Sequence, residues 1–248
     1  MKKYTFIFLL LFPLLVYGGG LTTSMCGGGT PVSASCDDTT GMLLAEDAEG
    51  TGTPSGWTDV NSVNWDVTSS PLRGSQSVAM DTQGESTKTP ATALGGELWG
   101  FARLSMTDGN PAATVNPLNI RDSSDVLLWK IAVATNGGIR QYQGTNYDNS
   151  SVSFADGAVG PYCIFFHVAR GAGTGNGTAQ VWIPLCSAIC TGGVCTRPET
   201  ASATTTDGTW DSGDADANHL YMVNGSTDNV LTLDQIRLDT SEFTTVCE

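Results

Sequence analysis

Cysteines are the residues whose type and spacing carry the clearest chemistry in this sequence. Six of the 7 form an even set suited to disulfide bonds: Cys36, Cys163, Cys186, Cys190, Cys195 and Cys247. The Gly-rich segment 171–178 separates two apolar runs and is typical of a hairpin loop. If the hairpin pairs symmetrically about this loop, Cys163 faces Cys186 at the short separation that a cross-strand disulfide requires.

Two further bridges follow from the remaining cysteines of this set. Cys190 and Cys195 flank the turn 191–194, which can close on itself. Cys36 and Cys247 are then left as a pair that ties the first strand to the last. Disulfides are the default for such a set in an oxidising compartment, and the scheme leaves Cys26 over.

A zinc site is the alternative for three of these cysteines. Cys186, Cys190 and Cys195 lie close together in the sequence, but we find no fourth ligand near them. A structural zinc site takes four ligands, and thiolate ligands suit a reducing compartment better. We therefore prefer the disulfide interpretation.

Oxygen ligands gather in the acidic segment 207–218. Asp214, Asp216 and Asn218 alternate along the chain as the ligands of calcium loops do, although the Gly and the distal Glu of an EF-hand are missing. We expect calcium to bind here. The alternative is a solvated acidic loop in a very acidic protein.

Aromatic residues in expected loops and strand ends suggest a surface for sugars. Trp57, Trp65, Tyr142 and Tyr147 lie at such positions among asparagines, and Trp210 is a fifth candidate. Aromatic faces beside polar groups can form a stacking platform. The alternative is that these rings form the edge of the hydrophobic core.

Charge and the N-terminal segment restrict partner and compartment. The 248 residues carry 11 Lys and Arg against 25 Asp and Glu, a net charge of −14, so a phosphate backbone would be repelled and nucleic acid is excluded. Lys2 and Lys3 precede the apolar stretch 4–17, which is too short for a comfortable membrane span. We expect a signal peptide at 1–20, no membrane span in the mature chain, and a protein that is secreted or held on a cell surface. An uncleaved anchor is the alternative.

The elements that must position these residues are strands, because helical periodicity is almost absent while short Val- and Thr-rich runs alternate with turn residues. The expected strands are 41–47, 75–80, 97–107, 115–121, 126–134, 139–143, 163–169, 180–183, 219–223 and 231–238. Many short antiparallel strands predict an all-β sandwich or jelly roll. We expect a flexible lead at 21–40, the sandwich at 41–248, and a strand-poor, disulfide-held excursion at about 186–215.

The strand order resembles that of concanavalin A-like, laminin G-like jelly rolls. The resemblance rests on the opening run 44–50 leading to Trp57, on the middle strands 98–104, 118–124 and 127–131, and on the closing run 233–238. It covers about residues 41–243 and implies an antiparallel jelly-roll β-sandwich. Lectins, adhesion modules, glycoside hydrolases and structural surface proteins share this fold, so it does not decide function.

The resemblance also implies a second calcium site, and it indicates which carboxylates a catalytic member would carry. Similar jelly rolls often carry a structural calcium between the first and last strands, where Asp47 or Glu49 would join Asp234. The hydrolases of this superfamily carry two catalytic carboxylates on one strand, and alternation brings such a pair to the separation that retaining chemistry needs. Glu46, Asp47 and Glu49 only approach this pattern, at a strand end. We expect no hydrolase activity.

Two functions from different classes fit these observations. The first is a non-catalytic structural or adhesive subunit whose jelly rolls self-associate, as a homo-oligomer, into a surface layer, fibre or filament. The signal sequence, the lead and the disulfides favour it. The alternative is a lectin-like module that binds a surface glycan through its loops.

Overall fold

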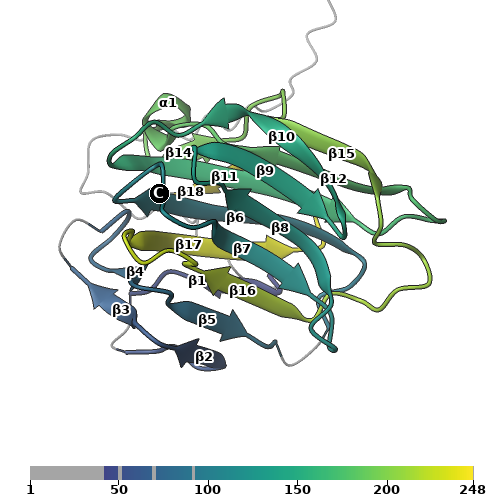
Figure 1. Ribbon diagram of the computed structural model, residues 1–248, viewed down its shortest axis with the longest axis horizontal. Helices are drawn as coiled ribbons and strands as arrows, with labels where there is room; N and C mark the ends of the chain where they lie inside the picture. Colours follow the sequence, from purple (N-terminus) through teal and green to yellow (C-terminus); the bar gives the residue numbers. More distant parts are fainter. Residues whose placement is uncertain (1–41, 50–51, 69–70, 91–92, 248) are drawn as a thin grey trace, which may run out of the picture. The chain divides into compact units, whose positions relative to one another are not determined.

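Antiparallel strands account for most of the protein. The computed structural model describes residues 42–49, 52–68, 71–90 and 93–247, which belong to one compact unit. The expected signal peptide and lead, together with Cys26 and Cys36, lie outside the described residues. Two sheets pack face to face as a sandwich, which confirms the predicted fold class (Figure 1).

The first sheet has eight strands in the order β15-β12-β11-β6-β17-β4-β3, with β1 paired to β17. Its strands are β1 (Leu44–Glu46), β3 (Val63–Val67), β4 (Ser77–Met80), β6 (Glu97–Met106), β11 (Val159–Ala169), β12 (Gly177–Trp182), β15 (Ala203–Gly208) and β17 (Leu231–Asp239). The pairing of β1 with β17 places the first described strand beside the last long one, as the sequence predicts.

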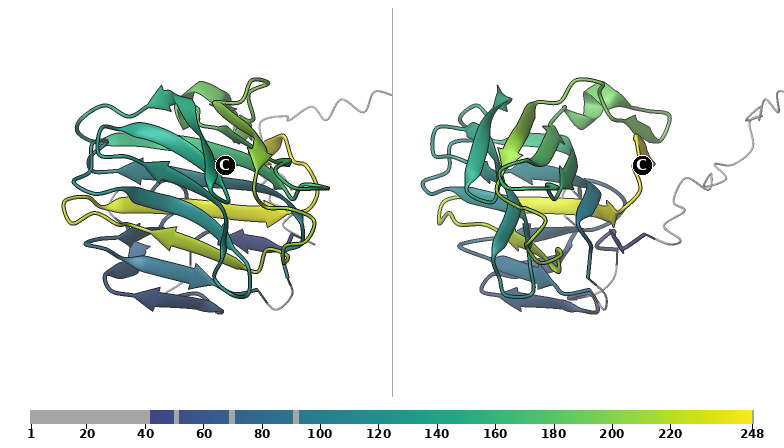
Figure 2. Two further views of the ribbon diagram at one scale, coloured as in Figure 1. Left: turned by 45° about the vertical axis from the view of Figure 1, so that its right-hand side comes forward. Right: turned by 90° about the vertical axis from the view of Figure 1, so that its right-hand side faces the viewer.

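The second sheet has seven strands in the order β10-β9-β8-β7-β16-β5-β2 (Figure 1). Its strands are β2 (Trp57–Val60), β5 (Glu85–Lys88), β7 (Val115–Arg121), β8 (Leu127–Val133), β9 (Gly138–Gln143), β10 (Asn146–Ser153) and β16 (His219–Val223). Figure 2 shows the two layers from two further directions.

A small third sheet lies beside the sandwich. It has the order β13-β14-β18, with β13 at Cys190–Thr191, β14 at Val194–Thr196 and β18 at Thr245–Cys247. Helix α1, Cys186–Ile189, precedes it. Within the described residues, no helix is long and apolar enough to cross a membrane.

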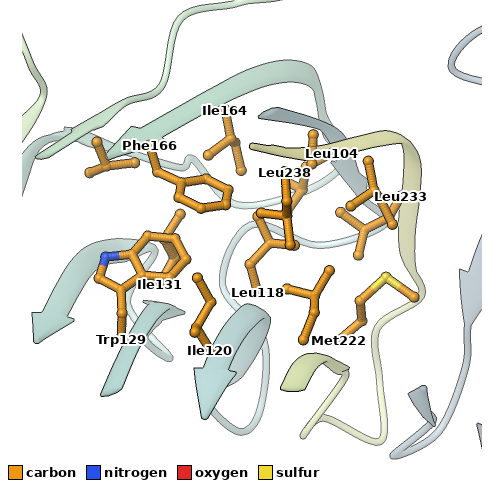
Figure 3. Close-up of a cluster of buried hydrophobic side chains, with 14 of the residues drawn as sticks. Leu104, Leu118, Ile120, Trp129, Ile131, Ile164, Phe166, Met222, Leu233 and Leu238 are labelled. Carbon is orange, nitrogen blue, oxygen red and sulfur yellow. The ribbon is translucent and has the colours of Figure 1, made fainter. Parts of the chain in front are cut away.

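The hydrophobic core fills the space between the two large sheets (Figure 3). Trp129 of β8 stacks on Phe166 of β11 with ring centroids 4.4 Å apart. Ile120, Ile131 and Met222 of the seven-stranded sheet are also buried in this layer. Burial of this apolar surface is the main stabilising contribution, and it fixes which face of each strand points inward.

The structure has all ten expected strands, and it has others that the sequence did not predict. The unpredicted strands of the large sheets are β2, β3, β5, β10 and β15. Strands β5 (ESTK), β10 (NYDNSSVS) and β15 (ATTTDG) are polar, because they lie at or near sheet edges where one face meets solvent.

The expected excursion at 186–215 needs a correction. Residues 186–196 do leave the sandwich as α1, β13 and β14. Strand β15 lies in the same range, however, and pairs with β12 as the edge of the eight-stranded sheet. A count of apolar residues overlooks this strand because its buried residues are Ala203, Thr205 and Gly208, none of which is strongly apolar.

Gly100 on β6 tests the packing of the core. A Cβ at this position would lie 1.9 Å from Cζ of the buried Phe166 ring. We expect Gly100→Ala to lower the free energy of unfolding by about 1–3 kcal/mol, because the ring must leave its place on Trp129. Gly173→Ala is the matched control, since its Cβ would meet only an ordinary contact at 3.7 Å. Chemical denaturation curves that overlay for both variants and the wild type would contradict this packing.

Candidate functional site

The outward side of the seven-stranded sheet, hereafter the outer face, carries a row of polar and aromatic side chains. Cross-strand partners lie on the same side of a sheet. The pairing runs from Tyr147 on β10 to Tyr142 on β9 and on to Lys130 on β8. It continues to Asn119 on β7 and Tyr221 on β16. Five neighbouring strands therefore present one continuous line of side chains.

The two tyrosines at one end of this row lie against each other. The ring centroids of Tyr142 and Tyr147 are 5.2 Å apart with an interplanar angle of 34°, and Tyr147 is 50% exposed. Lys130 Nζ lies 4.6 Å from the centroid of Tyr142, and Arg140 Cζ lies 5.2 Å from that of Tyr147. A hydrogen bond with Tyr142 raises the pKa of Arg140. Both tyrosines are ligand-binding candidates from the sequence, and the structure brings them together.

A second group at the other end of the row was not predicted. The Arg121 guanidinium lies 4.6 Å from the Tyr221 ring centroid, and the Tyr221 hydroxyl donates to Asp125. His219 Nδ1 is 3.4 Å from Asp125 Oδ1. The hydrogen bond from Tyr221 lowers the pKa of Asp125, whereas burial and that carboxylate raise the pKa of Tyr221.

The signal for this second group was partly present in the sequence. His219 and Tyr221 stand two residues apart in a strand whose other side chains are apolar, which places both on the outward face. The pairing of β16 with β7, which brings Arg121 to them, is a long-range property that the spacing does not show.

The tryptophan candidates lie in the core. Trp57 is 7% exposed, Trp65 is 2% exposed, and their ring centroids are 5.0 Å apart. Their indole N–H groups donate to Glu46 and Asp59. Trp210 is also buried. These rings cannot stack on a ligand, and the alternative interpretation as edges of the core holds for them.

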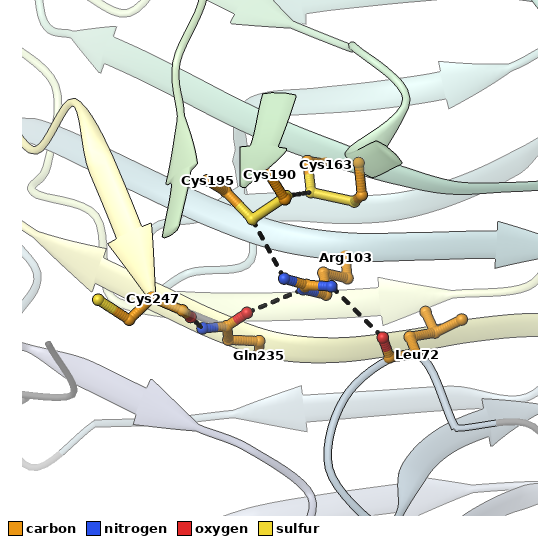
Figure 4. Close-up of a disulfide and its surroundings, with 8 residues drawn as sticks. Leu72, Arg103, Cys163, Cys190, Cys195, Gln235 and Cys247 are labelled. Atoms are coloured by element: carbon orange, nitrogen blue, oxygen red, sulfur yellow. Dashed lines mark hydrogen bonds between the residues drawn. A yellow bond between two sulfur atoms is a disulfide. The ribbon is translucent and has the colours of Figure 1, made fainter. Parts of the chain in front are cut away.

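One disulfide joins the sandwich to helix α1, which leads into the small sheet, and a second lies within the small sheet (Figure 4). Cys163 on β11 is bonded to Cys186 with an S–S distance of 2.04 Å, and Cys190 is bonded to Cys195 at 2.02 Å. Both are pairs that the sequence predicts. Cys247 is disulfide-bonded, but its predicted partner Cys36 lies outside the described residues, so that pairing stays a prediction.

Arg103 of β6 lies under these bridges. Its Nη2 donates to Cys195 Sγ at 3.2 Å, and its Nε donates to Gln235 Oε1 at 2.9 Å (Figure 4). The Sγ atoms of Cys163, Cys190 and Cys195 lie within 4.8 Å of one another. They belong to disulfides, and zinc binds thiolates, so the oxidised cluster is not the zinc site considered as an alternative.

Comparisons with known proteins agree on the architecture. No protein-family model matches the sequence, and no curated protein is significantly similar to it. The solved structure of "Cellulose induced protein, Cip1" matches 83% of this chain and 100% of its own, with a TM-score of 0.54 and 13% identity. The T. cruzi calreticulin globular domain matches 81% of this chain and 89% of its own, with a TM-score of 0.52 and 6% identity.

A botulinum neurotoxin type C structure matches 82% of this chain with a TM-score of 0.53 and 9% identity. The chain has the concanavalin A-like fold. It spans 48% of the neurotoxin chain and 17% of a matching sialidase chain. At these identities the likeness concerns the fold alone.

The acidic segment 207–218 begins at the end of β15 in this concanavalin A-like sandwich. Asp214 Oδ2 accepts a hydrogen bond from the Asp211 backbone at 2.6 Å. Asp216 forms an ion pair with Arg170 at 2.9 Å, while the Asn218 backbone donates to Arg121. Among the described residues, the ligand atoms of no three Asp, Glu or His residues converge within 4.8 Å. Calcium binding here remains a proposal, supported by the exposed carboxylates of Asp207 and Asp214.

The second predicted set lies around the segment that precedes β4. Asp47 contacts both Arg73 and Arg237, and Glu49 accepts from Ser75 Oγ at 2.6 Å. Asp234 is buried and accepts from the Arg73 backbone at 2.9 Å. The structure thus brings the three acids to one segment, where arginines offset the charge of Asp47.

A thermal melt tests both calcium proposals. A cation that binds only the folded chain stabilises it, by about 2.7 kcal/mol at a hundredfold excess over Kd. We expect millimolar calcium to raise the melting temperature relative to chelator, and the double variant Asp214→Asn, Asp216→Asn to lose this rise. A rise that survives the double variant moves the site to Asp47, Glu49 and Asp234. Identical wild-type melts with calcium and chelator would exclude both.

Asp234 also predicts a pH dependence. Burial, with the nearby charge of Asp47, raises its pKa from 3.8 to about 7, despite hydrogen bonds from Ser77, Gln235 and Arg73. Between these two values the folded protein keeps a proton that the unfolded chain has released, so stability falls as the pH rises, by at most ~1.4 kcal/mol per pH unit. We expect Asp234→Asn to flatten the fall in unfolding free energy between pH 5 and pH 8. Parallel pH profiles for variant and wild type would contradict the assignment.

Proposed function

We propose that the protein is a non-catalytic, secreted glycan-binding module that holds its ligand on the outer face. The observation that carries this proposal is the pair of neighbouring tyrosines, Tyr142 and Tyr147, on a solvent-facing sheet surface with Lys130 and Arg140 beside them. The disulfides suit an oxidising, extracellular environment.

The chemistry of this surface suits a sugar. Tyrosine rings offer an apolar face to the C–H groups of a pyranose, and their hydroxyls hydrogen-bond to its hydroxyls. Both rings come from paired strands, so their positions are set by the sheet. Little ordering is needed on binding, which favours affinity. For the botulinum neurotoxin type C that shares this fold, cell entry is dependent upon interaction with two ganglioside molecules.

A binding role without catalysis is supported by the composition of the central strands. Strands β7, β8 and β9 contain no Asp or Glu. Glycoside hydrolysis usually needs two carboxyl groups, about 5–5.5 Å apart in retaining enzymes. Asp125, a carboxylate at the end of the row, contacts Tyr221 and His219.

A self-associating structural or adhesive subunit is the second candidate. The observation that favours it is that the large sheets end in the short strands β2 and β3, at whose outer edges no further strand is paired in the described chain. Unpaired edges can add a strand from a second copy, and Val60 on β2 is 49% exposed. Size-exclusion chromatography and negative-stain microscopy of secreted material distinguish this subunit from a monomeric binder.

Glycan binding is tested with a polysaccharide panel and substitutions at the tyrosine pair. We expect the wild type to retain at least one polysaccharide. The double variant Tyr142→Ala, Tyr147→Ala should bind it about 10- to 100-fold more weakly, because each stacking contact contributes ~0.5–1.5 kcal/mol beyond its buried area. The Phe double variant should keep most of the affinity, since it keeps both rings. We also expect no release of reducing ends from the bound polymer.

The control is Val60→Ala, an exposed residue at the far end of the same sheet. It should bind as the wild type does. Equal affinity of the Ala double variant and the wild type would refute the proposed site, and cleavage of the polymer would refute the non-catalytic role.

A further inference from the structure

The outer face pairs each of its three tyrosines with a cation. Lys130 lies over Tyr142, Arg140 over Tyr147 and Arg121 over Tyr221, at 4.6, 5.2 and 4.6 Å from the ring centroids. These residues come from five adjacent strands, β10, β9, β8, β7 and β16. With neighbouring strands ~4.8 Å apart, the row extends about 19 Å, the scale of several linked sugar rings.

The positive charge of this row is unusual for the protein. The chain has 11 Lys and Arg against 25 Asp and Glu. Four arginines elsewhere pair with carboxylates: Arg73 and Arg237 with Asp47, Arg170 with Asp216, and Arg197 with Glu242. In the part of the chain that the structure describes, neither Lys130 nor Arg140 pairs with a carboxylate. Their charges face solvent without an acidic partner.

The third cation, Arg121, lies beside an acid and has one buried donor without a partner. Arg121 Nε is buried and has no hydrogen-bond partner, and Asp125 lies close enough to offset part of the guanidinium charge. An arginine fork can hold a carboxylate or sulfate through two parallel hydrogen bonds. The row therefore combines stacking surfaces with donors for an anion at intervals across the sheet.

We infer that the ligand of the outer face is an acidic polysaccharide, whose carboxylate or sulfate groups bind Lys130, Arg140 and Arg121 while its sugar rings stack on the tyrosines. This inference rests on the proposed function and specifies its ligand. A nucleic acid has a denser phosphate charge and requires a broader basic surface than these three cations supply. A polymer with charged groups spaced along its sugar rings matches a surface that carries both tyrosine rings and cations.

A matched pair of polymers separates charge from sugar recognition. Polygalacturonate and its fully methyl-esterified form share one backbone and differ in carboxylate charge. We expect the purified protein to bind polygalacturonate or a sulfated galactan at least about tenfold more tightly than the esterified polymer. This binding should weaken steeply as salt rises from about 50 to 500 mM, because screening shortens the reach of exposed charges. Comparing polygalacturonate with the sulfated galactan shows whether carboxylate or sulfate is preferred.

Substitution of the cations completes the test. Lys130→Met with Arg140→Gln should lower affinity for the acidic polymer at least about tenfold, whereas Lys88→Met, on the same sheet beside Trp57, should not change it. Equal binding of charged and esterified polymers, unaffected by salt and by the cation variants, would overturn the inference and leave the proposed function standing. If the wild-type protein binds none of the tested polysaccharides, the proposed function itself is refuted. Duplex DNA that competes as well as polygalacturonate would also overturn the inference.

Discussion

Two buried glutamines on β9 hold the outer face in register. Gln143 Nε2 donates to the backbone carbonyls of Ala169 and Thr178 in the opposite sheet, at 2.7 and 3.0 Å. Gln141 Nε2 donates to the Ala179 carbonyl at 2.9 Å. Because strand side chains alternate, fixing these two inward positions fixes the intervening side chain, Tyr142, outward. A slip by one residue would expose the glutamines and bury the tyrosine.

Glycines on the eight-stranded sheet make this contact possible. A Cβ at Gly208 would lie 1.3 Å from Gln143 Oε1, and one at Gly177 would lie 2.3 Å from it. Both glycines belong to strands β12 and β15, which pair with each other. The hydrogen bonds from Gln143 to the opposite sheet therefore depend on these two glycines, which leave room for its side chain. This arrangement fixes the side of the sheet from which Tyr142 projects.

The sequence predicts the apolar half of the fold well, because a strand with one buried face shows its periodicity. Strands β7 and β16 have the bounds expected for them. It fails where both faces are polar, as in β10. Trp57 and Trp65 looked like surface rings because their strands are short and follow turn residues, yet each occupies the buried position of its strand. Burial of an indole outweighs a polar neighbourhood in the sequence.

The same limit applies to the candidate site. Tyr142 and Tyr147 stand five residues apart across a tight turn, so their proximity is local and could be predicted from the sequence. Lys130 and Arg121 reach the row only through strand pairings that no spacing reveals. Long-range packing decides the order of the strands in the sheet, and this order brings the separate tyrosines and cations together on one surface.

Hydrogen–deuterium exchange of the protein with and without an oligogalacturonate would test the central claim most directly. The account predicts slower exchange in β8, β9 and β10 on binding, with β2 and β3 unchanged. Protection confined to β2, β3 or the loop 207–218, with β8 to β10 exchanging as in the free protein, would contradict it.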